Sequence, residues 1–172
     1  AAALAKAVGF LDAPYTGRQF RQVTDQTEIK QMLNKMAETL AANRNEFGTW
    51  NSDILNRQDY KTPESSGSSF FVYMLAKGMN DGWLDSEVYG PVVLKAYFTL
   101  LNSVDVDGDL HSIQRVGTGP EGTNFFASDQ TLNSNSEDLA SNDFNYGVGA
   151  FLMATAEMAK LPAELLAHFG SV

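Results

Sequence analysis

Cysteine is absent from this sequence of 172 residues, and histidine is nearly absent. The absence of cysteine excludes disulfides, thiolate metal sites and a cysteine nucleophile, although it leaves the cellular compartment open. The two histidines, His111 and His168, are too few and too far apart in the sequence to indicate a metal cluster or a catalytic triad. We therefore expect a protein that works without a metal or another cofactor.

Basic charge is also scarce. Lys and Arg number 12 against 21 Asp and Glu, and the formal net charge is −9. A nucleic-acid or anionic-membrane partner would need clustered Lys and Arg, so both are disfavoured. No apolar run approaches the length that crosses a bilayer, and no charged-then-apolar signal segment opens the chain. These absences predict a soluble, acidic protein with neither a membrane nor a nucleic-acid partner.

Familiar loops for cations and phosphates are missing as well. Asp105, Asp107 and Asp109 have the alternating spacing of a calcium loop, but an EF-hand requires Gly at its sixth position and Glu at its twelfth. Those positions hold Leu110 and Val116, so a solvated turn is expected there. The sequence also lacks a Gly-rich phosphate loop and a nucleophile elbow.

What the sequence does contain is helical periodicity. Apolar residues make up 44% of the chain and charged residues 19%, which are ordinary globular values, and the length fits one domain over residues 1–172. Apolar residues recur at helical spacing in several segments, which predicts an all-α fold. The expected helices span 1–11, 26–44 (capped by Thr24 or Asp25), 66–78, 86–104 (capped by Ser86) and 146–160, and a short amphipathic tail follows Pro162.

The stretch 63–78 reads as a polar loop that turns into a buried helix. Ser65 or Ser66 is the expected N-cap, and Gly78 is the expected stop. A helix N-terminus that carries hydroxyls beside Glu64 suits a polar ligand, because its first N–H groups have no partner within the helix. A well-capped core helix fits the same pattern, so both interpretations stay open at this point.

The order of elements repeats along the chain. A long amphipathic helix leads to a Gly-x-apolar loop at 48–54, and a second one leads to a similar loop at 108–113. Each loop precedes a helix start rich in small residues, at 66–71 and at 147–152. Small residues allow close approach, so these two helices are expected to line a crowded interior, with the amphipathic helices outside. The alternation favours an α/α toroid, although periodicity alone also fits an open solenoid.

Four motifs occur in an order and spacing known from one group of enzymes. They are PESSGS at 63–68, LAKGMNxGWLD at 75–85, QRVG at 114–117 and YGVGAFLMAxxEM at 146–158. Together they resemble the C-terminal half of unsaturated rhamnogalacturonyl hydrolases and unsaturated glucuronyl hydrolases, glycoside hydrolase families 105 and 88. The resemblance extends from Leu4 to Lys160 and implies an (α/α)6 barrel.

The same resemblance implies that only part of such a barrel is present. Family members are about twice as long, and their general acid/base aspartate lies in an N-terminal half that has no counterpart here. Their Arg-Gly-Asn-Gly-Trp-like stretch, which helps to hold the uronate, is also missing. About half of the barrel, its C-terminal half, is therefore expected. Such a half would expose apolar surface, so self-association, a complementary N-terminal half or a place within a larger protein is expected.

The chemistry that the resemblance implies is hydration of a double bond. The expected partner is an oligosaccharide, such as a rhamnogalacturonyl oligosaccharide from pectin, that ends in an unsaturated uronic acid. A carboxylic acid protonates the ring double bond while water adds, and the hydrated sugar then releases its neighbour. This reaction needs one positioned Asp or Glu and no metal. The alternatives are a carbohydrate-binding or structural fragment without turnover, and a repeat module for protein contacts.

Glu64 is the local candidate for a catalytic carboxylate. The positive end of the helix beside it suits an acceptor or a hydroxyl binder better than an acid, so the catalytic acid stays unassigned. Ser65, Ser66 and Ser68 are candidates to hydrogen-bond a sugar hydroxyl or a carboxylate, with helix capping as the alternative.

The remaining candidates for substrate binding lie on loops and at a helix start. Trp50 is a candidate platform for sugar stacking or an anchor for its loop. Gln114 and Arg115 follow the second Gly-x-apolar loop, and Arg115 can pair with a uronate or form a surface salt bridge. Tyr146 opens the last inner helix, where its hydroxyl can reach a cavity.

Overall fold

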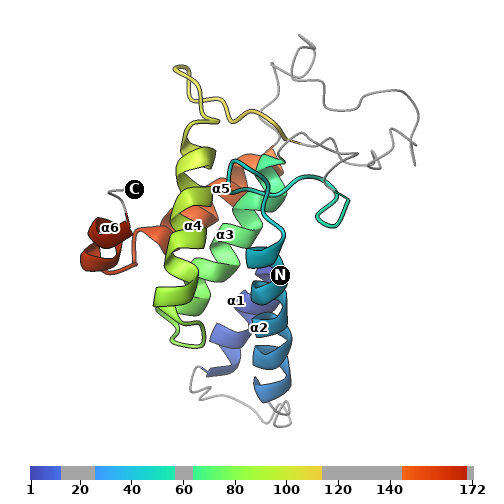
Figure 1. Cartoon of the computed structure of the whole chain (residues 1–172), viewed down its shortest axis with the longest axis vertical. Helices are drawn as coiled ribbons and strands as arrows, with labels where there is room; N and C mark the ends of the chain where they lie inside the picture. The colour runs from blue at the N-terminus through green and yellow to red at the C-terminus, as the bar shows by residue number, and fades with distance from the viewer. Residues whose placement is uncertain (13–25, 57–63, 114–144, 170–172) are drawn as a thin grey trace.

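The computed structural model describes residues 1–12, 26–56, 64–113 and 145–169 (Figure 1). Six α-helices lie in these ranges, and the β-structure within them is limited to isolated bridge residues, among them an antiparallel bridge between Val104 and Leu110. The helices are α1 (Ala2–Asp12), α2 (Gln26–Ala42), α3 (Ser65–Asn80), α4 (Ser86–Leu101), α5 (Asn145–Met158) and α6 (Ala163–Phe169). The all-α prediction is therefore confirmed.

The helices form two rows. Helices α1, α3 and α5 make one row, in which α3 contacts both of the others. Helix α2 packs on α1, α4 packs on α3, and α6 packs on α4. Figure 1 shows α3 in the middle of the group, with α4 along one side and α6 beyond it. This is the predicted alternation of an inner row with outer amphipathic helices.

Helix α3 is the centre of the hydrophobic core. Five consecutive residues in its middle, Val72 to Ala76, are buried, so the helix has no solvent-facing stripe there. A helix that is apolar all round must be surrounded by other elements. The core of α3 continues into α1 through Val8, into α2 through Leu33 and into α4 through Val93.

Both predicted serine caps are wrong by one residue. Helix α3 is capped by Glu64, whose carboxylate accepts the N–H groups of Ser66 and Gly67. Helix α4 is capped by Asp85, whose carboxylate accepts the N–H of Glu87. In each case the acidic residue before the expected serine has the extended backbone of a cap, and its anionic oxygen suits the positive end of the helix. The expected caps of α2, Thr24 and Asp25, lie outside the described residues.

Gly78 does not stop α3 as predicted. The helix continues to Asn80, Asp81 is its C-cap, and Gly82 follows with a positive φ of 73°. Gly78 lies inside the helix because the chain that leaves α3 folds back on it. A Cβ at Gly78 would lie 2.6 Å from Cδ1 of Leu84 and 2.9 Å from Cη2 of Trp83. The long helices also end earlier than expected, α2 at Ala42 and α4 at Leu101.

A buried carboxylate links the C-terminal ends of α3 and α5. Glu157 is 7% exposed, and its backbone oxygen and Oε2 accept hydrogen bonds from Nδ2 of Asn80 at 2.9 and 3.0 Å. Its Oε1 pairs with Nζ of Lys160 at 2.8 Å. Nearby, Lys77 pairs with Asp81 at 2.8 Å. Burial alone would lower the pKa of Lys77, but the hydrogen bond to Asp81 and the surrounding negative charge outweigh burial and raise it.

Replacing Asn80 should destabilise the fold through this carboxylate. Asn80→Ala removes both hydrogen bonds to Glu157 and leaves a buried charge underpaired, so we expect the free energy of unfolding to fall by about 1–3 kcal/mol. Lys160→Ala removes a partner that is itself 60% exposed and should cost less than about 1 kcal/mol. Urea unfolding followed by circular dichroism measures both. Equal losses in the two variants would contradict this account.

Two glycines of α5 should respond in opposite directions to the same substitution. A Cβ at Gly147 would lie 2.5 Å from Cδ1 of Ile113, whereas nothing lies within 4 Å of one at Gly149. Gly147→Ala should therefore destabilise the protein by about 1–3 kcal/mol through overpacking. Gly149→Ala should be neutral or stabilise it by up to about 1 kcal/mol, because Ala favours helix. Denaturation midpoints at unchanged slope test the pair.

Candidate functional site

The first turn of α3 has no unpaired backbone donor. The first four N–H groups of a helix have no acceptor within it. Here the N–H of Glu64 donates to the Trp50 carbonyl at 2.9 Å, and that of Ser65 donates to the Ser112 carbonyl at 2.8 Å. The N–H groups of Ser66 and Gly67 donate to the two carboxylate oxygens of Glu64. The predicted outward-pointing donors for a ligand are therefore absent from this helix start.

The serine hydroxyls of this turn also bond within the protein. Ser66 Oγ donates to Oε1 of Glu64 at 2.6 Å. Ser68 Oγ lies between the backbone groups of Trp50, accepting its N–H at 3.1 Å and contacting its carbonyl at 3.3 Å. Ser69 Oγ donates to the Ser65 carbonyl at 2.7 Å. Of the three hydroxyls, that of Ser68 joins the loop that carries Trp50 to α3, and the other two bond within the first turns of the helix.

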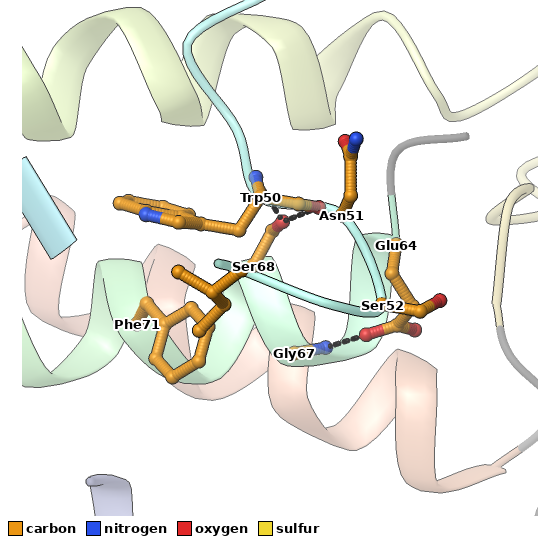
Figure 2. Close-up of a pocket in the computed structure, with 8 residues that line it drawn as sticks. Trp50, Asn51, Ser52, Glu64, Gly67, Ser68 and Phe71 are labelled. Atoms are coloured by element: carbon orange, nitrogen blue, oxygen red, sulfur yellow. Dashed lines mark hydrogen bonds between the residues drawn. The ribbon is translucent and has the colours of Figure 1, made fainter. Parts of the chain in front are cut away.

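A pocket of about 100 Å³ opens at this helix start (Figure 2). Figure 2 shows the Glu64 carboxylate beside Gly67, the rings of Trp50 and Phe71 on the other side, and Ser68 between them. The lining residues come from the loop after α2 and from α3: Trp50, Asn51, Ser52, Ile54, Glu64, Gly67, Ser68 and Phe71. The pocket therefore combines an apolar wall with one buried carboxylate.

Trp50 anchors the loop rather than presenting a ring face to solvent. Its side chain is 1% exposed, and its indole N–H donates to the Leu40 carbonyl at 2.9 Å. Its ring meets Phe71 edge-to-face, with centroids 5.3 Å apart and an interplanar angle of 76°. Of the two roles considered for Trp50, the described structure shows the anchoring one.

The pocket gathers three of the predicted site residues, Trp50, Glu64 and Ser68. Ser65 and Ser66 lie in the same turn, but they do not line the pocket. Gln114 and Arg115 lie outside the described residues. Tyr146 belongs to the first turn of α5, as predicted, and its side chain is not among those described.

Five lining residues were not predicted from the sequence: Asn51, Ser52, Ile54, Gly67 and Phe71. Gly67 is adjacent to Ser68 and Phe71 lies three residues after it, so helical spacing could have indicated both. Ser52 is of particular interest because its hydroxyl has no hydrogen-bond partner among the described residues. No signal in the sequence identifies Ser52, since its place depends on how the loop folds back onto α3.

The predicted aspartate turn near His111 is a hydrogen-bonded loop. His111 Nε2 lies 2.8 Å from Oδ2 of Asp105. This contact, followed by the backbone N–H groups of Asp109 and Asp107, lowers the pKa of Asp105 below its ordinary value. Within the residues that the structure describes, no three His, Cys, Asp or Glu side chains come together as metal ligands. No helix in those ranges is both long and apolar enough to cross a membrane.

Comparison with known proteins places this geometry in a family. The model described as Glycosyl Hydrolase Family 88 matches residues 2–162. A curated relative from Formosa agariphila, named unsaturated 3S-rhamnoglycuronyl hydrolase, is 32% identical over 135 residues, which cover 78% of this chain and 32% of the relative. The chain thus spans about a third of the length of the curated relative.

Solved structures agree on the fold. A structure of a glycosyl hydrolase family 88 protein from Bacteroides vulgatus is 27% identical, with a TM-score of 0.67 over 92% of this chain and 41% of that one. A possible member of glycoside hydrolase family 105 from Salmonella enterica, 18% identical, shares the fold with a TM-score of 0.66 over 90% of this chain and 36% of that one.

These neighbours are (α/α)6 toroids, and the two rows of helices described above form part of one such toroid. The family match spans almost all of the chain, including both Gly-x-apolar loops, the pocket and the inner helices α1, α3 and α5. The chain belongs to Glycosyl Hydrolase Family 88.

Proposed function

We propose that this chain, as one α/α unit over residues 1–172, forms one wall of the sugar site of an unsaturated uronyl hydrolase. Its substrate would be an oligosaccharide that ends in an unsaturated uronic acid, such as a rhamnogalacturonyl oligosaccharide, and the reaction would hydrate the uronyl double bond. The pocket at the start of α3 carries this proposal, since it combines the carboxylate of Glu64 with an apolar wall. The name of the Formosa relative supports an unsaturated glycuronyl substrate.

The size of the pocket indicates how much of a sugar it can hold. Sites that enclose a drug-sized ligand measure roughly 300–1,000 Å³, and this pocket measures about 100 Å³. It would therefore take one edge of a sugar ring. The rest of the site would come from other segments, and Gln114, Arg115 and Tyr146 stay in the proposal as uronate or hydroxyl binders.

The polar groups of the pocket suit recognition of hydroxyls. Ser52 presents a hydroxyl that can donate or accept. Glu64 supplies an anionic acceptor, and Ser65 and Ser66 lie beside it in the same turn. Ile54 and Phe71, which are partly exposed, supply the apolar contact that a sugar ring face prefers, and the buried Trp50 anchors the loop that carries Ile54.

Glu64 itself serves as a helix cap and acceptor, which does not match the role of a general acid. We infer that the catalytic acid belongs to another part of the toroid, in a complementary N-terminal half or a second copy. Apolar side chains exposed on α4 and α5, namely Val88, Phe98 and Leu152, would pack against such a partner. The capping role of Glu64 also favours the second candidate function, a carbohydrate-binding or structural unit without turnover.

Turnover and binding by the chain itself separate these functions. The assay follows loss of ultraviolet absorbance of an unsaturated rhamnogalacturonan disaccharide, and calorimetry measures its binding to a sample shown by circular dichroism to be helical. Turnover supports the hydrolase, and binding without turnover supports the binding unit. A folded chain that neither binds nor turns over the disaccharide contradicts both roles for the chain on its own.

A pair of cap variants tests whether Glu64 contributes to the site. Glu64→Gln and Asp85→Asn each weaken an N-cap carboxylate, so each should lower the free energy of unfolding by about 0.5–2 kcal/mol. Only Glu64 lines the pocket, so Glu64→Gln should weaken disaccharide binding by about tenfold, the worth of one charged hydrogen bond. Binding by Asp85→Asn should stay within about twofold of the wild type. Equal losses of binding would show that Glu64 acts through stability alone.

A further inference from the structure

The loop between α2 and the pocket is held by the backbone and side chain of Asn45. Its N–H donates to the Thr49 carbonyl at 2.8 Å, and its carbonyl accepts the N–H of Gly48 at 3.0 Å. Its Oδ1 accepts the N–H groups of Phe47 and Thr49 at 3.0 and 3.1 Å. Gly48 has a φ of +87°, a conformation that favours glycine. Asn45 is therefore the centre of the turn.

The loop after α4 has the same arrangement around Asp105. The N–H of Asp105 donates to the Asp109 carbonyl at 3.0 Å, and its carbonyl accepts the N–H of Gly108 at 3.2 Å. Its Oδ1 accepts the N–H groups of Asp107 and Asp109 at 3.0 and 2.9 Å. Gly108 has a φ of +93°. Adding 60 to each residue number of the first loop gives the second, so the two loops are structural repeats.

Each loop also has a side-chain contact between equivalent positions, and in the first loop Nδ2 of Asn45 donates to Oγ1 of Thr49 as well, at 3.1 Å. Nδ2 of Asn45 donates to Oδ1 of Asn51 at 2.7 Å. Oδ2 of Asp105 meets Nε2 of His111 at 2.8 Å. We call these contacts the first clasp (Asn45–Asn51) and the second clasp (Asp105–His111). The first clasp is a hydrogen bond between two neutral amides. In the second, the imidazole of His111 donates a hydrogen bond to the carboxylate of Asp105.

The segments that carry the two clasps accept hydrogen bonds from adjacent backbone amides at the start of α3. The first clasp spans Trp50, which lies between its two residues and whose carbonyl accepts the N–H of Glu64. The second clasp precedes Ser112, whose carbonyl accepts the N–H of Ser65. The first clasp belongs to the loop that lines the pocket, and none of the residues of the second clasp lines it.

We infer that Asn45 is a positioning residue for the sugar site, acting through the first clasp to place Trp50, Asn51 and Ser52 against the start of α3. This inference rests on the proposed function of the pocket. Asn45 has no contact with the pocket itself, so its effect passes through Asn51 and the turn. An amide is needed at position 45 because it must accept two N–H groups and donate to Asn51 at once.

Amide hydrogen exchange of the wild type and single variants tests the clasps without any ligand. Asn45→Ala should raise the exchange rate of the Glu64 amide by about tenfold and leave that of Ser65 within about threefold. Asp105→Ala should do the reverse. These changes correspond to the loss of one or two hydrogen bonds at a net worth of about 1 kcal/mol each. Equal acceleration of both amides in either variant would overturn the inference.

Exchanging the clasps provides a rescue. Asn45→Asp keeps the acceptor for the turn but removes the Nδ2 donor to Asn51 and Thr49, so it should accelerate exchange at Glu64. The double variant Asn45→Asp with Asn51→His copies the second clasp into the first loop. It should return exchange at Glu64 to within about threefold of the wild type. If the Glu64 amide exchanges as fast in the double variant as in Asn45→Asp, the two clasps are not equivalent.

Disaccharide binding then connects the first clasp to the site. Asn45→Ala should weaken binding by about tenfold, the double variant should recover it, and Asp105→Ala should leave it within about twofold. If the wild type does not bind the sugar, the proposed function fails, while the exchange data still decide whether the clasps act separately. If the wild type binds and Asn45→Ala binds equally well, the positioning role is wrong.

Discussion

The start of helix α3 depends on acceptors that lie outside the helix. A buried N–H without an acceptor costs about 1–3 kcal/mol, and α3 begins in the interior, between two loops and α5. The carbonyls of Trp50 and Ser112 and the carboxylate of Glu64 supply all the missing acceptors. Both loops therefore complete the hydrogen bonding of the helix that contacts α1, α4 and α5.

This arrangement explains why the site is built from a loop and the helix together. A helix N-terminus with free donors could bind an anion directly. Here those donors hold the loops, so the groups that face the pocket are side chains of the first loop and of α3. Ser52 and Trp50 take their places from the contact between that loop and α3, and Phe71 belongs to the helix. The recognition surface and the core therefore share the same hydrogen bonds.

The helices, their alternation and the family could be predicted from the sequence, because they depend on periodicity and on motifs that are local. The helix ends could not. Glu64 and Asp85, rather than the serines after them, became caps because the backbone enters each helix one residue earlier. Gly78 has the local signature of a stop, yet it lies within α3 to admit Leu84, a contact set by the returning chain.

The candidate site could be predicted in part for the same reason. Glu64 and Ser68 belong to one continuous motif, so their proximity follows from helical spacing. Trp50 lines the same pocket, but whether its ring faces solvent depends on its contacts with Leu40 and Phe71, which local sequence does not reveal. Ser52 could not be found, because its position follows from tertiary contacts alone.

The two loops match residue for residue, but the chain that joins each loop to its inner helix does not. From Asn51 to the cap of α3 the connection is short, whereas from His111 to the start of α5 it is much longer. Each connection begins after its turn, so a change in its length leaves the hydrogen bonds around Asn45 and Asp105 intact. Lengthening such a connection also costs little, because each doubling of a loop's length adds only about 0.6 kcal/mol of closure entropy.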